Sequence, residues 1–223
     1  MSELFSIQLQ NRQQQGRDGV WLDLPTTTEQ VQAALRQIGI SSDNPQGLFI
    51  SGYFAEEEKR FAIPYNMVLA SNVDELNFLA SRLETLSAGE HAELNAALQA
   101  PQSELSSIGR ITDFPENVDY YVHLPDVHGP AQLGDYYLNR SGMVDMPEEW
   151  KGGIDTAQFG RYVAQQEQGV FTQYGYLVKS GDEWQKVHEG QPVPEEYRVL
   201  SFPVSEILRD AANIPPPVQP ETE

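Results

Sequence analysis

Acidic side chains outnumber basic ones in every part of this chain, and this imbalance constrains its fold and partners more than any motif. The 223 residues include 33 Asp and Glu against 14 Lys and Arg, a formal net charge of −19. Residues 1–68 hold 8 acids and 5 bases, and residues 69–108 hold 6 and 1. Residues 109–200 hold 15 and 7, and residues 201–223 hold 4 and 1. No acidic tail therefore accounts for the charge.

The charge and composition exclude several classes of protein. A DNA-binding or anionic-membrane surface has to neutralise phosphates, so we expect neither partner. With 10 Tyr, 9 Phe and 3 Trp, the chain has the aromatic content that fills cores and that disordered acidic chains lack. The absence of cysteine excludes disulfides, thiolate zinc sites and a cysteine nucleophile. No apolar run approaches the roughly 18 residues of a membrane span, and the first residues do not resemble a signal peptide. We therefore expect a soluble, cytoplasmic protein.

Hydrophobic periodicity predicts a small α+β module at the start of the chain, over residues 1–68. Residues 4–10 alternate between apolar and polar side chains, which is typical of a half-buried strand. Residues 19–24 form a second apolar run that ends at a proline, and residues 48–50 form a third. Between them, the capping-box spacing at residues 27–30 predicts the start of an amphipathic helix.

Two further capping-box spacings, at residues 72–75 and 87–90, predict a helical hairpin over residues 69–108. A third module, α+β, is predicted over residues 109–203. Its elements are a strand at 119–123, a helix from Pro130 to Gly142, a helix after Asp155, a strand at 170–178 and an edge strand at 197–202. Residues 204–223 form an extended, proline-rich acidic tail. The predicted fold class is α+β, with three small modules and this tail.

The search for catalytic and metal-binding motifs yields one weak candidate. Phosphate loops, zinc-protease, nucleophile-elbow and EF-hand motifs are all absent from the sequence. His123 and His128 bracket Asp126, which would suit a metal ion if the segment curled around it. Pro125 and Pro130 favour a plain connection from strand to helix. We therefore expect no cofactor, no metal and no enzymatic activity.

Three other features allow two interpretations each. The acids Glu56, Glu57 and Glu58 follow a predicted strand, either as a solvated loop tip, which we favour, or as an anionic cluster for a basic partner. The acids of the predicted hairpin allow the same two interpretations. A solvated helix face does not explain why lysine is scarce among them, because such faces normally mix both signs. Tyr136, Tyr137 and Trp150 belong either to the core or to an interface, and their spacing favours the core.

Several stretches, in order from residue 4 to residue 178, resemble the ArdA antirestriction family, small acidic proteins of conjugative plasmids and transposons. In the first half these stretches are Phe5–Gly16, Gly19–Pro25, Leu48–Tyr53 and Asp74–Ala80 with Leu86. In the second half they are Leu133–Leu138, Gly142–Val144, Met146–Pro147, Ile154–Asp155, Phe159–Tyr162 and Tyr174–Tyr176. The chain departs from the family pattern at Gly52, in the longer segment 56–60, and in residues 180–223, which extend past the family's usual end.

The resemblance implies an elongated, three-module protein, usually dimeric. It also implies that the protein mimics bent B-form DNA and occupies the DNA groove of type I restriction-modification enzymes. A protein of this kind would block restriction of incoming mobile DNA and so evade host defence. The resemblance leaves open whether methylation is blocked as well. The net charge of a dimer, twice −19, equals that of roughly 65 Å or about 19 base pairs of B-DNA. Inhibition should weaken with salt and ignore the recognition sequence.

On this hypothesis, exposed acids stand in for phosphates and bind the enzyme's Lys and Arg side chains. The candidate residues are Glu56, Glu57, Glu58, Asp74, Glu75, Glu84, Glu90, Glu93, Asp119, Asp126, Asp135, Glu148 and Glu149. Each contributes little, so activity should decline gradually as acids are removed. Two alternatives are an acidic module that sequesters another basic DNA-binding or conjugation protein, and an enzyme with a carboxylate site, which one or two substitutions would abolish.

Overall fold

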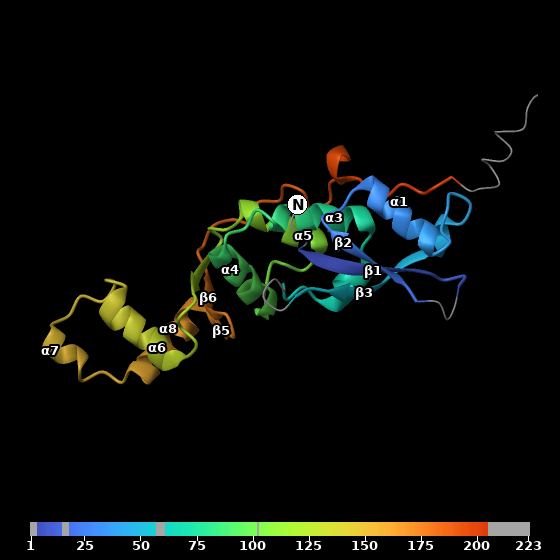
Figure 1. Cartoon of the computed structure of the whole chain (residues 1–223). Coiled ribbons are helices and arrows are strands. Elements are labelled where there is room, and N and C mark those ends of the chain that lie inside the picture. The colour runs from blue at the N-terminus through green and yellow to red at the C-terminus, as the bar shows by residue number, and fades with distance from the viewer. Residues whose placement is uncertain (1–3, 15–17, 57–60, 102, 205–223) are drawn as a thin grey trace, which may run out of the picture.

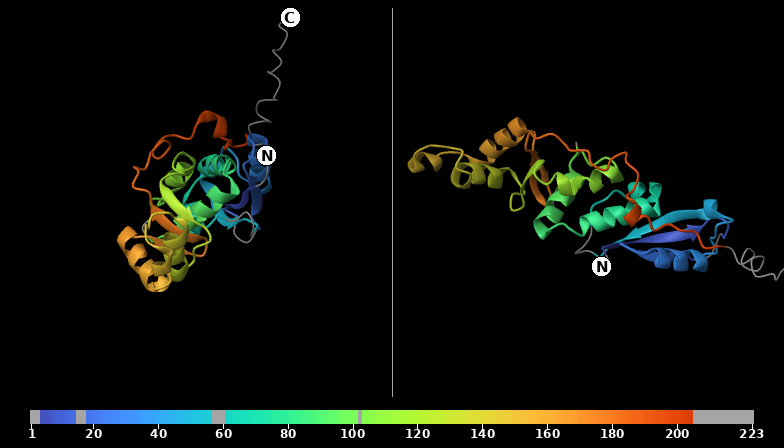
Figure 2. Two further views of the ribbon diagram at one scale, coloured as in Figure 1. Left: turned by 90° about the vertical axis from the view of Figure 1, so that its left-hand side faces the viewer. Right: turned by 90° about the horizontal axis from the view of Figure 1, so that it is seen from above.

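The computed structural model describes residues 4–14, 18–56, 61–101 and 103–204. It is an α+β protein with helices and two small antiparallel sheets, which confirms the predicted fold class. Figures 1 and 2 show an elongated molecule. The first sheet lies towards one end, helices occupy the middle, and the second sheet and residues 130–167 lie towards the other end.

The alternating pattern at the start of the chain builds the first sheet. Strand β1 (Phe5–Asn11) lies between β2 (Val20–Leu24) and β3 (Leu48–Phe54), and both pairs are antiparallel. Every second residue of β1 is buried, so one face of the sheet belongs to the core, as the period-2 pattern predicts. Strand β3 is longer than the apolar run at 48–50 from which it was predicted.

Helix α1 (Thr28–Gln37) begins at the predicted capping box. The Thr27 hydroxyl accepts a hydrogen bond from the N–H of Gln30, and the Gln30 side-chain oxygen accepts one from the N–H of Thr27. This reciprocal pair satisfies two backbone donors that a helix start would otherwise leave free. One face of α1 packs into the same core as the sheet.

The next two helices also begin at predicted capping boxes. Helix α3 (Val73–Leu83) starts after the Asn72 cap, and α4 (Ala88–Gln99) starts after the Ser87 cap. In each case a glutamate three residues after the cap completes the box. The two helices of the predicted hairpin are therefore present where the sequence predicts them.

Short helical segments are the elements that periodicity did not predict. They are α2 (Tyr65–Ala70), α5 (Ile108–Thr112), α7 (Glu148–Lys151) and the 3₁₀ turns Pro45–Gly47, Phe114–Glu116 and Glu195–Tyr197. Each is six residues or shorter, which is too short to show the helical repeat of apolar residues.

The second sheet corrects one prediction. Strands β4 (Tyr121–Leu124) and β5 (Val170–Thr172) flank β6 (Gly175–Lys179), and both pairs are antiparallel. The single strand predicted over residues 170–178 is wrong, because the chain turns back between β5 and β6. Two strands of a hairpin continue one apolar pattern, so periodicity alone did not reveal the turn.

Gly175 and Thr172 make that turn. Gly175 has a φ of +119°, a conformation that residues with a Cβ rarely adopt. The Thr172 hydroxyl accepts from the N–H of Tyr174 at 3.1 Å and donates to the carbonyl of Gly175 at 2.9 Å. These local bonds close the hairpin.

Two predicted helices pack tightly beside the second sheet. Helix α6 (Pro130–Asp135) continues as a π-helical turn over Tyr136–Arg140, and α8 (Thr156–Glu167) follows its Asp155 cap. A Cβ built on Gly160 would lie only 1.8 Å from the carbonyl oxygen of Pro130. The two helix backbones therefore touch at this point, and glycine is the residue that fits.

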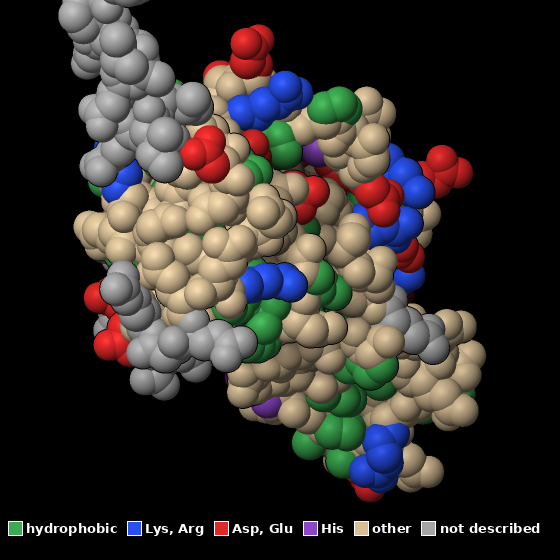
Figure 3. Space-filling view, turned by 90° about the vertical axis from the view of Figure 1, so that its right-hand side faces the viewer, with side chains coloured by type: hydrophobic (Ala, Val, Ile, Leu, Met, Phe, Trp, Pro, Cys, Tyr) green, Lys and Arg blue, Asp and Glu red, His purple; other side chains and the backbone are tan. Residues whose placement is uncertain are grey.

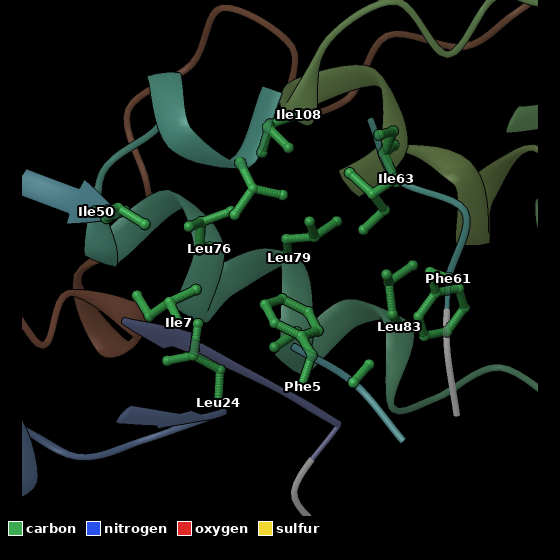
Figure 4. Close-up of a cluster of buried hydrophobic side chains, with 14 of the residues drawn as sticks. Phe5, Ile7, Leu24, Ile50, Phe61, Ile63, Leu76, Leu79, Leu83 and Ile108 are labelled. Carbon is green, nitrogen blue, oxygen red and sulfur yellow. The ribbon is translucent and has the colours of Figure 1, made fainter. Parts of the chain in front are cut away.

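The main hydrophobic core runs from the first sheet through the middle helices. Figure 4 shows Phe5 and Ile7 of β1 near Leu76, Leu79 and Leu83 of α3. The same cluster continues to α4, α5, β4 and β6. The predicted module boundaries at residues 68 and 108 stay predictions, and this core is continuous across both of them.

A smaller core lies at the far end of the molecule. Val127, Leu133 and Tyr176 are buried together, with half-buried side chains of α8 and β5 around them. The phenol of Tyr176 donates to Glu167 of α8 at 3.0 Å. This cluster joins the α6–α8 pair to the second sheet.

After β6 the chain continues as an extended segment, residues 180–204, which we name the terminal strap. It runs back along the molecule to the region of the first sheet (Figures 1 and 2). The edge strand predicted at 197–202 is wrong, because those residues pair with no strand. Instead, the N–H groups of Val199 and Leu200 both donate to Oδ1 of Asp74, at 2.8 and 2.7 Å.

Two buried polar side chains hold the middle of the terminal strap. The carboxylate of Asp113, fully buried, accepts hydrogen bonds from the N–H groups of His188 and Glu189, at 2.6 and 3.2 Å. Asn117 bonds both backbone groups of Gln185, at 2.7 and 2.9 Å. These side chains take the place of a neighbouring strand, since they form hydrogen bonds with backbone groups of the extended segment.

The terminal strap ends beside α1. The amide of Gln32 donates to the hydroxyl of Ser201 at 3.1 Å, and the N–H of Ser42 donates to the carbonyl of Pro203 at 3.0 Å. Most of the predicted tail, residues 205–223, lies outside the described residues. Over the described ranges, the chain has no helix with the length and apolar character that crossing a membrane requires.

Candidate functional site

The candidate acids are spread along the molecule from the end of β3 to α7, and they do not converge on one cleft. Glu56 follows β3 and is exposed. Glu57 and Glu58 lie outside the described residues, so the structure does not decide between the two interpretations of this triplet.

Three candidate acids lie on α3 or directly after it. Asp74 is half-buried, contrary to expectation, because it anchors the terminal strap. Glu75 is exposed, but its Oε2 accepts from the N–H of Asn72 in the capping box. Glu84, just past the end of the helix, is exposed.

The structure brings three candidate acids together at α4 and the turn before β4. Glu90 and Glu93 lie one turn apart on α4, and the exposed Asp119 lies close enough to act electrostatically on Glu93. Glu90 and Glu93 are half-buried, not exposed as expected. The Glu90 carboxylate accepts from the N–H of Ser87 at 2.7 Å.

Proximity and burial change the charge of this group. Burial, followed by the negative charges of Glu90 and Asp119, raises the pKa of Glu93 to about 8. Hydrogen bonds from the Ser87 side chain and N–H lower the pKa of Glu90. At neutral pH, Glu93 is therefore mainly protonated and contributes little negative charge to the surface.

At the far end of the molecule, two candidate acids are paired with cations and two are not. Asp135 forms an ion pair with Arg140 at 3.1 Å, and Glu148 forms one with Lys151 at 2.6 Å. Asp126 and Glu149 are exposed and form no ion pair within the described residues. Asp135 is half-buried, contrary to expectation.

The terminal strap adds exposed acids that the sequence reasoning missed. They are Asp182, Glu183, Glu195 and Glu196. Their signal in the sequence was the high acid count of residues 109–200, but no pattern separated them from acids such as Asp113 and Glu189, which the fold uses internally.

Two cations of the described residues form ion pairs that link distant parts of the fold. Arg110 bridges Glu104 and Glu189, at 2.5 and 2.9 Å, and Lys179 also pairs with Glu104 at 2.9 Å. These hydrogen bonds lower the pKa of Glu104 and of Glu189. These cations therefore pair with acids that hold the fold, whereas Asp119, Asp126 and Glu149 form no ion pair within the described residues.

The segment between His123 and His128 is a connection from strand to helix, as favoured. It joins the end of β4 to the start of α6, and Nε2 of His123 lies 2.7 Å from the carbonyl oxygen of Tyr174. Among the described residues, no three His, Asp or Glu side chains are arranged to hold a metal ion.

The prediction that three aromatic residues belong to the core holds for two of them. Tyr136 and Tyr137 are half-buried and pack against the smaller core. Trp150 is 66% exposed, so its assignment to the core is wrong. It lies on the four-residue helix α7, which has no buried residue.

Figure 3 shows the molecule from the end that carries the first sheet. On this face, the Asp and Glu side chains form separate patches with Lys and Arg between them. Uncharged side chains and backbone cover most of the area that the figure colours. Any partner that contacts this end therefore meets polar and apolar surface as well as carboxylates.

The fold and surface define the class: an elongated, acidic α+β protein with carboxylates exposed along its length. A family model described as antirestriction protein (ArdA) matches residues 15–178. This match covers most of the chain, so the protein belongs to the ArdA antirestriction family. Strand β1 and the terminal strap lie outside the match. No curated protein matches the chain.

Proposed function

We propose that this protein inhibits type I restriction-modification enzymes by occupying their DNA-binding groove as an acidic mimic of DNA. The observation that carries the proposal is the ArdA family match over residues 15–178. The net charge of −19, which is spread over the whole chain, supports this mode of inhibition. The protein would act as a binding inhibitor, not as an enzyme.

The physical basis is the replacement of phosphates by carboxylates. A groove that binds DNA presents Lys and Arg side chains, and exposed carboxylates can form charge-assisted hydrogen bonds with them. The negative charge of the whole molecule would also steer it towards the groove and speed association. Both effects weaken as salt screens the charges.

We infer which candidate acids contact the enzyme from their exposure and from the contacts that several of them already make within the fold. We propose that Glu56, Glu84, Asp119, Asp126 and Glu149 contact the enzyme directly, because all five are exposed. The remaining described candidates would contribute less, since they cap helices, anchor the terminal strap, pair with cations or carry a proton. They are Asp74, Glu75, Glu90, Glu93, Asp135 and Glu148.

We also propose that the active form is a homodimer in the cytoplasm. The charge of one chain corresponds to roughly 32 Å of B-DNA, at about 1.7 Å per charge. Two chains end to end would match about 19 base pairs, which is a more plausible length for the DNA bound by a large restriction complex.

A competition assay tests the proposal. A purified type I enzyme would cleave unmodified DNA in the presence of increasing protein, at low and at high salt. We expect complete inhibition at low salt that weakens at high salt, and the same inhibition of DNA methylation. A type II endonuclease serves as the control and should keep its activity. Unchanged cleavage by several type I enzymes at saturating protein would refute the proposal.

A further inference from the structure

The outer face of the first sheet carries two large aromatic side chains that no described element covers. Trp21 of β2 is 49% exposed and Phe54 of β3 is 54% exposed. Their rings meet edge to face, with centroids 6.4 Å apart and planes at 72°. We name these two residues the aromatic pair. Single exposed aromatics are ordinary, but two in contact on a strand surface form a continuous apolar patch.

The strand register explains how the pair is held. Trp21 lies opposite Gln8 of β1, which lies opposite Gly52 of β3. A Cβ built on Gly52 would lie 3.0 Å from Cη2 of Trp21 and 3.0 Å from Cβ of Gln8. The Trp21 ring therefore reaches across β1 to the glycine, and lies against the sheet instead of extending freely into solvent. A fixed aromatic surface loses little conformational entropy when a partner binds.

Negative charge borders the aromatic pair. Asp23 lies one row from Trp21 on the same face of β2, and Phe54 and Asp23 both lie opposite Ser6. The carboxylate of Asp23 accepts from the Ser6 hydroxyl at 2.6 Å and forms no ion pair with a described residue. An aromatic ring next to a carboxylate that has no cationic partner is a favourable site for a cation, because both the ring face and the carboxylate attract positive charge.

The same sheet already contains one contact of this kind. The guanidinium of Arg12, just after β1, lies over the ring of Phe49 in β3, 5.2 Å from its centroid. No described cation covers Trp21 or Phe54. The aromatic pair therefore has the chemistry for a cation but lacks one from its own chain.

We propose that the aromatic pair binds an arginine or lysine side chain of the basic partner, which the proposed function identifies as the DNA-binding groove of a restriction enzyme. This inference rests on that function. The carboxylate of Asp23 beside the rings favours a cationic side chain over the same surface of a second copy, which would bring two such carboxylates together. Tryptophan is enriched among residues that dominate binding energy, so the pair would add affinity that carboxylates alone do not provide.

Two substitutions at one position test the inference. Trp21→Leu keeps apolar area but removes the ring, and Trp21→Phe keeps a weaker ring. In the competition assay, we expect Trp21→Leu to require about three to ten times more protein for half-inhibition, and Trp21→Phe to fall between it and the wild type. Tyr162→Ala is the control, because Tyr162 is also exposed, at 60%, but lies on α8 at the other end. It should inhibit like the wild type.

The outcomes separate this inference from the proposed function. If the wild type does not compete, the proposed function is wrong, and the proposed role of the aromatic pair is wrong with it. If the wild type competes and Trp21→Leu competes equally well, only the proposed role of the aromatic pair is wrong.

Sedimentation velocity provides a second readout. If Trp21→Leu converts a dimer to a monomer, the face joins two copies of the chain and the proposal is overturned. Thermal unfolding shows whether each variant is folded. If Trp21→Leu does not fold, Trp21→Phe still tests the contribution of the ring.

Discussion

The buried carboxylate of Asp113 and the backbone N–H of His188 are joined by a 2.6 Å hydrogen bond, although 75 residues separate them in the chain. A second bond from Glu189 to the same carboxylate makes Asp113 a fixed point for the terminal strap. The strap begins after the family match ends, so this attachment is an addition to the matched part of the fold.

We predict that Asp113→Ala lowers the free energy of unfolding by about 2 to 3 kcal/mol, because it leaves two backbone donors without their charged acceptor. Urea denaturation followed by circular dichroism measures this loss. Glu183→Gln, an exposed position on the same strap, is the control and should change stability by less than about 0.5 kcal/mol. Equal stability of the two variants would mean that the strap contributes nothing at Asp113.

A second prediction concerns the contact of α6 with α8. Gly160→Ala should destabilise the protein by about 1 to 3 kcal/mol or more, because its Cβ would overlap the carbonyl oxygen of Pro130. Gly152→Ala is a matched control, since a Cβ there has no atom within 4 Å. Thermal unfolding should show a lower midpoint for Gly160→Ala alone. A similar midpoint for both would contradict the close packing.

Stability should depend on pH through Glu93. Its pKa is raised from 4.5 to about 8, so the native state binds a proton that the unfolded state releases between these values. The free energy of unfolding should therefore fall as pH rises from about 4.5 to about 8. Glu93→Gln should unfold at a higher temperature than the wild type at pH 9, with a much smaller difference at pH 4.5. Glu149→Gln, the control, should show no such dependence; a parallel shift at both pH values for Glu93→Gln would disprove the mechanism.

If carboxylates replace phosphates, acids without a cation should matter more than acids with one. The double variant Asp119→Asn/Asp126→Asn should weaken inhibition more than Asp135→Asn/Glu148→Gln, although both remove two negative charges. Arg140 and Lys151 already offset the second pair. Each single substitution should cost less than about five-fold in half-inhibition concentration. Complete loss of activity from one substitution would instead indicate a specific carboxylate site.

Local sequence determined the elements that could be predicted. The caps at Thr27, Asn72 and Ser87 act within three residues, so their spacing was visible and the helices begin where expected. The alternation of β1 was equally local. The hairpin between β5 and β6 was missed, because Gly175 interrupts a run in which both strands share one apolar pattern.

Long-range contacts determined the features that the sequence did not predict. Asp74 satisfied every sequence criterion for an exposed acid, yet it bonds residues 125 and 126 positions further along the chain. Trp150 was assigned to the core from helical spacing, but α7 is too short to bury a face. The composition indicated an acidic surface, and only the fold separates exposed carboxylates from those that cap, anchor or pair.

The terminal strap also has a consequence for synthesis on the ribosome. The main core unites β1 with Val199, so its last member is translated long after its first. Contacts of such long sequence separation form slowly, because the intervening chain has to be ordered first. Nascent chains should therefore bury the first sheet and the middle helices early, and cover the outer surface of α3 only when the terminal strap leaves the exit tunnel.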